Sequence, residues 1–193
     1  DPLEPKQPRA AAGGRQQQKT RLTGGDSDTI PGGAPGKEEH TDLGNAKRFV
    51  RLDGDNIRYV PVWGRWLIWD GTRWREDDTN EIYCRAQMVI EDLLRQAQNL
   101  LQQARKARSK KKRDALLMEV EEITTWARRT ESKPRLYALV ELAGTLQEVT
   151  TTPDVFDRDP WLLNCPNGTV DLRPGELRPH RREDMLTKTT GVP

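Results

Sequence analysis

The chain has 193 residues, of which 34% are hydrophobic and 32% are charged, so it is long enough for one ordinary domain with a tail but is polar for a compact protein. Its formal net charge is only +2, which does not mark the whole chain as a polycation. No apolar run approaches the roughly 20 residues of a membrane span and residues 1–30 lack a signal-peptide core, so we predict a soluble cytoplasmic protein.

Residues 1–41 are predicted to form a disordered linker or tail. They are rich in Pro, Gly, Gln and Ser, and they contain too few large apolar residues to offset the entropy of ordering them. Residues 32–37 look like half of a phosphate-binding loop, but Glu38 stands where Ser or Thr is needed and no strand precedes them, so we interpret them as linker. The chain begins with Asp rather than Met and ends without a terminating pattern. We therefore expect it to be part of a longer polypeptide.

The folded part is expected over residues 42–193, beginning with a short helix over Asp42–Leu52. A β-hairpin pattern follows over Val60–Trp74 and contains four of the six tryptophans. The Asp70-Gly71 pair supplies the positive φ angles that a tight hairpin turn requires.

The strand before this turn carries aromatic residues on both faces. Because side chains alternate along a strand, Trp66 and Ile68 share one face, and Leu67 and Trp69 share the other. The tryptophans are interpreted either as a hydrophobic anchor of the core or as exposed rings that stack on nucleotide bases.

Three helices are predicted next. The first begins with a capping-box-like pair, Asp78 and Glu81. The second has a similar apolar stripe and is expected to pack antiparallel against the first as a helical hairpin. The third opens with Ser132 as N-cap and Pro134 in its first turn, and runs to about Leu146. The expected inward residues are Ala86, Val89, Ile90, Leu93, Leu94, Ala97, Leu100 and Leu101 in the first helix, Leu116, Leu117, Val120, Ile123, Trp126 and Ala127 in the second, and Leu136, Leu139, Val140 and Ala143 in the third.

The strongest charge feature lies between the first two helices. The candidate nucleic-acid-binding residues there are Arg105, Lys106, Arg108, Lys110, Lys111, Lys112 and Arg113, with no acidic residue among them. At the tip of a helical hairpin such a cluster could neutralise phosphates. It could also be a solvated loop, since Asp114, Glu119, Glu121 and Glu122 follow closely enough to pair with it or screen it.

Short strands are predicted again after Pro160. They cover Trp161–Asn164, Gly168–Leu172 and Glu176–Arg178, with turns at Asn167-Gly168 and at Arg173–Gly175. The predicted fold class is therefore α+β, with a helical middle of three helices, two of them forming a hairpin, flanked by short β-hairpins and preceded by a disordered N-terminal tail.

A second basic group ends this region and is a further candidate for phosphate contact. It consists of Arg178, Arg181 and Arg182 around His180, and Glu183 and Asp184 balance its charge.

Catalytic constellations are absent from the sequence pattern. His40 and His180 are its two histidines, Cys84 and Cys165 are far apart, and no pair has the spacing of zinc ligands. No nucleophile motif or complete phosphate loop is present, and His180 is interpreted as a surface turn residue. We therefore predict no catalytic, cofactor-binding or metal site in this chain.

Two stretches carry a resemblance to a known family. IRYVPVWGRWLIWDGTRWRED and DPWLLNCPNGTVDLRPGELRPHRREDMLTKTT resemble the helicase-associated domain of phage and plasmid primases, which is related to the poxvirus-type primase-helicases. The resemblance runs from about Gly44 to Thr190, and its most specific points are Trp-Asp-Gly-Thr-Arg-Trp and Asn-Cys-Pro-Asn-Gly-Thr. It implies a place between an upstream primase-like region and a downstream superfamily 3 helicase.

The resemblance also implies a role. The chain is expected to be a non-catalytic part of a DNA replication primase-helicase that positions DNA or neighbouring subunits. The implied partners are DNA, the primase and helicase modules in the same polypeptide, and further copies joined through the helicase, with no membrane. No cofactor is expected in this chain, whereas ATP and magnesium are implied for the helicase module.

Two other functions stay open at this stage. The alternative is a stand-alone DNA-binding or scaffold module from a mobile-element remnant, and the third is an enzyme without recognisable motifs. A phosphate loop and further helicase motifs in the reading frame after Pro193 would favour the primase-helicase, and their absence would favour the stand-alone module.

Overall fold

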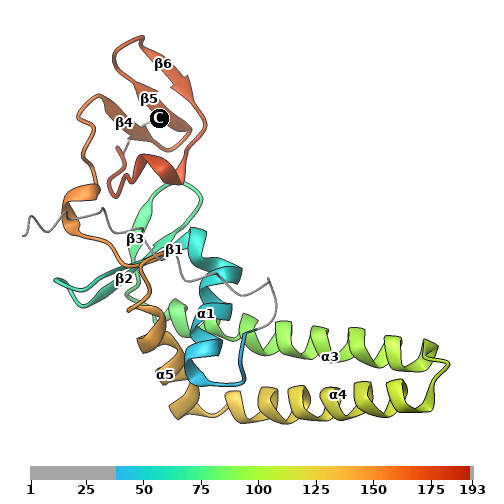
Figure 1. The fold of residues 1–193 in the computed structure, drawn as a ribbon. Helices are drawn as coiled ribbons and strands as arrows, with labels where there is room; N and C mark the ends of the chain where they lie inside the picture. Colours follow the sequence, from blue (N-terminus) through green and yellow to red (C-terminus); the bar gives the residue numbers. More distant parts are fainter. Residues whose placement is uncertain (1–37, 192–193) are drawn as a thin grey trace, which may run out of the picture. The chain divides into compact units, whose positions relative to one another are not determined.

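The computed structural model describes residues 38–191, so most of the linker expected over residues 1–41, including the loop-like segment 32–37, lies outside the described residues. The fold is α+β, as predicted (Figure 1). In chain order the elements are α1 (Asp42–Asp53), β1 (Ile57–Val60), β2 (Arg65–Trp69), β3 (Trp74–Glu76), α2 (Glu81–Ala86), α3 (Met88–Lys106), α4 (Lys110–Thr130), α5 (Lys133–Ala143), β4 (Leu162–Cys165), β5 (Gly168–Asp171) and β6 (Glu176–Arg178), with short 3-10 helices at Gly54–Asn56, Pro153–Val155 and Arg182–Asp184.

The first sheet has the antiparallel order β1-β2-β3. The predicted turn joins β2 to β3, and Gly71 has a φ of +98°. Asp70 stabilises this turn, because its Oδ1 accepts the backbone N–H groups of Thr72 and Arg73 at 2.8 and 2.9 Å. The sequence did not predict β1, which pairs with β2 so that Ile57 lies opposite Ile68.

Both faces of this sheet are covered, and the predicted alternation along β2 is confirmed. Ile68, with Trp66 packed beside it, belongs to the core formed with the helices. On the opposite face Leu67 packs with Trp74 and Phe156 in a second, smaller core. Burying such side chains contributes roughly 1.5–3 kcal/mol each, so the hairpin anchors two cores at once.

The outer edges of the first sheet are also covered. The N–H of Tyr59 in β1 donates to the carbonyl of Val149, and the N–H of Trp74 in β3 donates to the carbonyl of Leu186, both at 2.8 Å. These bonds satisfy edge groups that would otherwise be open to other strands. They also fix the segments after α5 and before the C-terminus against the hairpin.

The start of α2 differs from the prediction. The Asp77 carboxylate accepts the N–H groups of Glu81 and Ile82 at 2.8 and 2.9 Å. The predicted capping box between Asp78 and Glu81 is therefore wrong. Asn80 directly precedes α2 and has a left-handed backbone conformation, with a φ of 60°. With this backbone turn, the carboxylate at the start of the helix is that of Asp77 rather than that of Asp78.

The helical hairpin is confirmed, since α3 and α4 lie side by side and antiparallel (Figure 1). The predicted first helix is divided at Gln87, where α2 ends and α3 begins. Most of the expected stripe is buried or half-buried, but Leu94 and Leu117 are 38% and 42% exposed. A two-helix layer covers only one side of each helix, so residues at the margin of the stripe stay in solvent.

The third helix, α5, begins after Ser132, as predicted. The Ser132 hydroxyl nevertheless donates to the carbonyl of Arg129 at 3.0 Å and does not cap α5. The helix ends at Ala143 rather than Leu146. Gly144 follows, and a Cβ there would lie 3.1 Å from the Tyr59 ring, so this close approach favours glycine.

The second sheet has the antiparallel order β4-β5-β6. Cys165 pairs with Gly168, so the loop residues are Pro166 and Asn167, and the predicted Asn167-Gly168 turn is displaced by one residue. A Cβ at Gly168 would lie 2.6 Å from the carbonyl oxygen of Arg178. The glycine is therefore required by the close approach of β6 rather than by the turn.

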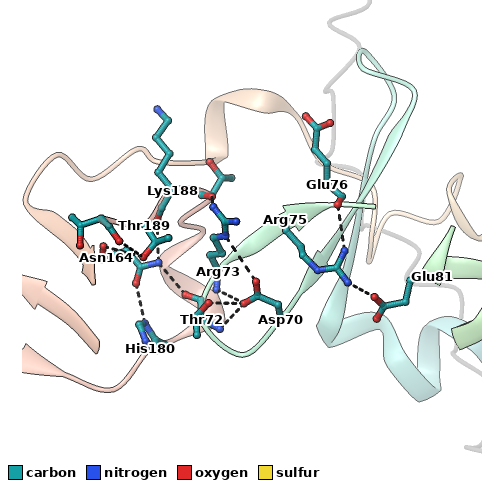
Figure 2. Close-up of polar contacts among 12 residues, drawn as sticks. Asp70, Thr72, Arg73, Arg75, Glu76, Glu81, Asn164, His180, Lys188 and Thr189 are labelled. Carbon is teal, nitrogen blue, oxygen red and sulfur yellow. Dashed lines mark hydrogen bonds and ion pairs between the residues drawn. The ribbon is translucent and has the colours of Figure 1, made fainter. Parts of the chain in front are cut away.

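One buried residue of this sheet bonds to the first sheet's loop. Figure 2 shows the Asn164 side chain, whose Nδ2 donates to the carbonyls of Thr72 and Lys188 at 3.1 and 3.0 Å. Its Oδ1 lies 2.9 Å from Nδ1 of His180. His180 is thus a half-buried member of this network, and its interpretation as a surface turn residue is wrong.

Candidate nucleic-acid interface

The predicted basic cluster lies at the turn between α3 and α4 (Figure 1). α3 ends at Lys106 and α4 begins at Lys110, so only Ala107–Ser109 connect them. We call this turn and the adjoining helix ends the basic tip. Its exposed cations are Arg105, Lys106, Arg108, Lys110, Lys111, Lys112 and Arg113.

Within residues 38–191, no ion pair joins a cation of the basic tip to a carboxylate. Other arginines are engaged: Arg48 and Arg51 lie 3.3 and 3.0 Å from Asp92. An unpaired surface cation keeps its full capacity to bind an anion from solution, because no internal carboxylate competes for it. The ion pairs with Asp114, Glu119, Glu121 or Glu122 that the sequence left open are not formed.

The helix end at the start of α4 also favours the binding of an anion at the basic tip. The first turn of α4 contains no acidic residue, and the Ser109 side chain makes no capping hydrogen bond. A helix N-terminus carries a partial positive charge, so Lys110 and its neighbours repel it. A bound phosphate would relieve this repulsion, whereas Arg105 and Lys106 already suit the C-terminus of α3.

Asp114 lies about 6 Å along α4 from Lys110, within a Debye length, whereas the glutamates of α4 lie farther along the helix. At about 1.5 Å per residue, Glu122 lies about 18 Å along the helix from Lys110, beyond a Debye length of about 8 Å at physiological salt. Glu121 and Glu122 instead line a hollow of about 450 Å³ beside Trp126 and His40. Burial lowers the pKa of His40, and the Arg48 charge adds to this effect, so the imidazole does not offset those carboxylates at neutral pH.

The second basic group is engaged in structural contacts. Arg178 forms two hydrogen bonds of 2.8 Å with Asp184, which raise the pKa of its guanidinium. Arg182 donates to Asn56 at 2.7 Å, and its carbonyl accepts the indole N–H of Trp74. Arg181 is exposed, and its guanidinium has no ion pair among the described residues. The structure therefore does not gather this group into one cationic site.

The sequence left open whether the tryptophans of the hairpin are core residues or exposed rings, and the structure contains both kinds. Trp74 is fully buried, and Trp66 and Trp69 are half-buried, so these rings belong to the cores. Trp63, in the turn between β1 and β2, is 42% exposed. Sequence reasoning did not single out Arg73, which lies in the turn directly before Trp74.

Metal ligands and membrane spans are not found in the part of the chain that the structure describes. It contains no group of three or more His, Cys, Asp or Glu side chains placed to hold a metal ion. Cys84 is exposed, Cys165 is buried, and both are free thiols. Among the described helices, none combines the length and apolarity needed to cross a bilayer.

Two comparisons with known proteins bear on identity. The search of curated proteins gave no match. A family model described as D5 N-terminal-like matches residues 46–193, which include the tryptophan hairpin, the basic tip and the second sheet. This match covers most of the sequence, so the chain belongs to the D5 N-terminal-like family, whose domain is found in phage, plasmid and viral primase-helicases.

Proposed function

We propose that this chain is the helicase-associated domain of a phage or plasmid primase-helicase, and that it contacts DNA through the basic tip. The observation that carries the proposal is the cluster of exposed cations at the turn between α3 and α4, which form no ion pair with any residue of the described range 38–191. Membership of the D5 N-terminal-like family supports a place in DNA replication.

The position of the basic tip suits phosphate contact. It lies about 28 Å along α3 from the start of that helix, at the end remote from α5. Lysine and arginine side chains there can reach successive phosphates without entering a groove. Such contacts hold DNA in place without reading its sequence, which is what a positioning domain requires.

The catalytic work belongs to other modules in this proposal. A superfamily 3 helicase downstream in the same polypeptide binds ATP and magnesium and joins the copies into an oligomer, and a primase region lies upstream. This domain positions DNA or neighbouring subunits for the helicase.

The proposal is tested by replacing Lys110, Lys111, Lys112 and Arg113 with Gln, which keeps helix-forming side chains. DNA affinity is expected to fall similarly for unrelated sequences, because phosphate contacts are sequence-independent. The matched control replaces Lys47, Arg128, Arg129 and Arg158 with Gln; these residues are also exposed, and the change in net charge is the same. Equal decreases in affinity for both variants would show that overall charge, and not the basic tip, governs binding.

A further inference from the structure

Trp63 is an exposed aromatic ring held in a fixed position. It lies in the turn between β1 and β2, and its ring stacks on Phe156 with centroids 6.1 Å apart and planes 25° apart. Phe156 is itself 8% exposed and belongs to the smaller core. The orientation of the Trp63 ring is therefore set by the core, although 42% of the residue remains accessible.

A hollow of about 230 Å³ opens beside this ring. Its lining consists of Trp63, Leu67, Arg73, Trp74, Arg75, Glu76 and Thr187. The floor is apolar, since Leu67 and Trp74 are buried core residues. Glu76 pairs with Arg65, so the charge of its carboxylate is offset. The hollow thus combines an aromatic wall and an apolar floor with polar groups at its rim.

Arg73 brings a weakly engaged cation to the rim. Its Nε lies 3.9 Å from Asp70, and its Nη1 donates to the carbonyl of Thr187 over a long 3.4 Å (Figure 2). A guanidinium has five N–H donors, so most of its capacity remains available. The backbone beneath it is fixed, because Asn164 binds the carbonyl of the preceding residue, Thr72, at 3.1 Å.

We propose that this hollow binds one unstacked base of single-stranded DNA, with the base stacked against Trp63 and a neighbouring phosphate held by Arg73. An aromatic platform beside a cation is the arrangement by which single strands are bound with little sequence preference. Paired bases in a duplex keep their faces stacked on one another, so a duplex has no free base to offer. The inference rests on the proposed contact with DNA and adds a second site, specific for single strands.

The test compares two labelled oligonucleotides of equal length, one of deoxythymidine and one of abasic deoxyribose phosphate, by fluorescence anisotropy. Trp63→Ala is expected to weaken binding of the deoxythymidine strand roughly 5- to 150-fold. Its affinity for the abasic strand is expected to stay unchanged, because that strand carries the phosphates without bases. Arg73→Gln is expected to weaken binding of both strands.

Two further variants keep the test decisive. Trp63→Phe retains a ring and is expected to retain most of the binding, while thermal melting shows whether each variant is folded. Trp161→Ala is the matched control, since Trp161 is 51% exposed in the second sheet region and lies outside the hollow. It is expected to leave both affinities unchanged.

The inference would be overturned if Trp63→Ala lost the same affinity for both strands. It would also be overturned if Trp161→Ala weakened binding of the deoxythymidine strand as much as Trp63→Ala does. The proposed function fails separately, if the four-residue tip variant binds duplex DNA as the unaltered chain does. If Trp63→Ala weakened binding of the deoxythymidine strand alone while the tip variant bound duplex DNA as the unaltered chain does, the result would support the hollow. It would contradict DNA contact through the basic tip.

Discussion

Asn164 in β4 donates from Nδ2 to the carbonyl of Thr72 at 3.1 Å, and so bonds the second sheet to the loop between β2 and β3. The Asn164 residue is only 4% exposed. The same amide group donates to Lys188, while its oxygen lies within hydrogen-bond distance of His180. One side chain therefore fixes the turn that carries Arg73 and the segment that follows the second sheet.

Asn164→Ala is expected to lower the free energy of unfolding by about 1–3 kcal/mol, because it removes the donor of two part-buried hydrogen bonds, each worth about 0.5–1.5 kcal/mol. Urea denaturation measures this decrease. Asn99→Ala, at an exposed position of α3, is the matched control and is expected to be stabilising by up to about 0.7 kcal/mol, because Ala is the better helix former. A neutral Asn164→Ala would show that the bond between the sheets contributes nothing to stability.

Trp74→Ala is expected to lower the free energy of unfolding by about 3–5 kcal/mol, because the ring is fully buried. Trp69→Ala is expected to cost less, since Trp69 is only half-buried. Chemical denaturation of both variants checks the order. If Trp69 proved the more costly, the assignment of Trp74 to the centre of the smaller core would be contradicted.

Asp77→Ala is expected to lower stability by about 0.5–2 kcal/mol, the usual cost of removing a helix cap. Its carboxylate bonds the N–H groups of both Glu81 and Ile82. Asp78→Ala is the matched control, because Asp78 is exposed and makes no capping bond in the described structure. Thermal melting of the two variants measures both losses of stability. A larger loss for Asp78→Ala would support the predicted capping box instead of the cap by Asp77.

A pH-dependent contribution is expected from Glu81. The Arg85 hydrogen bond, reinforced by the charges of Arg85 and Arg75, holds the pKa of Glu81 below its ordinary value of 4.5. A carboxyl with a lowered pKa in the folded state stabilises the fold above its unfolded pKa, and this stabilisation is lost as the pH falls through the lowered value. Glu81→Gln is therefore expected to be less stable than the unaltered chain at neutral pH, with a difference that shrinks in acid. Urea titrations across this range measure it, and a difference that grows in acid would contradict the assignment.

Local patterns in the sequence predicted much of this fold. The apolar spacing of α3 and α4 predicted the hairpin, and the Asp70-Gly71 pair predicted the turn, because both signals act between near neighbours. β1 was missed, since its pairing with β2 depends on tertiary contact and its residues show no distinctive alternation. The bond from Asn164 to Thr72 joins residues 92 positions apart, and no local pattern encodes it.

The candidate site was predictable to a similar degree. A run of cations without acids marked the basic tip, but the sequence could not show that the nearby glutamates leave it unpaired. It also could not separate Trp63 from Trp74, because only packing decides which ring is buried. The hollow beside Trp63 depends on Phe156 and Thr187, which are distant in sequence.

The salt dependence of duplex DNA binding tests the central claim most directly. For the variant with Lys110, Lys111, Lys112 and Arg113 replaced by Gln, the slope of log affinity against log salt is expected to become shallower by about 0.9 for each phosphate that is no longer neutralised, or about 3.6 if each of the four side chains neutralises one. The control with Lys47, Arg128, Arg129 and Arg158 replaced by Gln is expected to keep the original slope. Equal affinities and parallel slopes for the tip variant and the unaltered chain would contradict the account, because the basic tip would then be only a solvated turn.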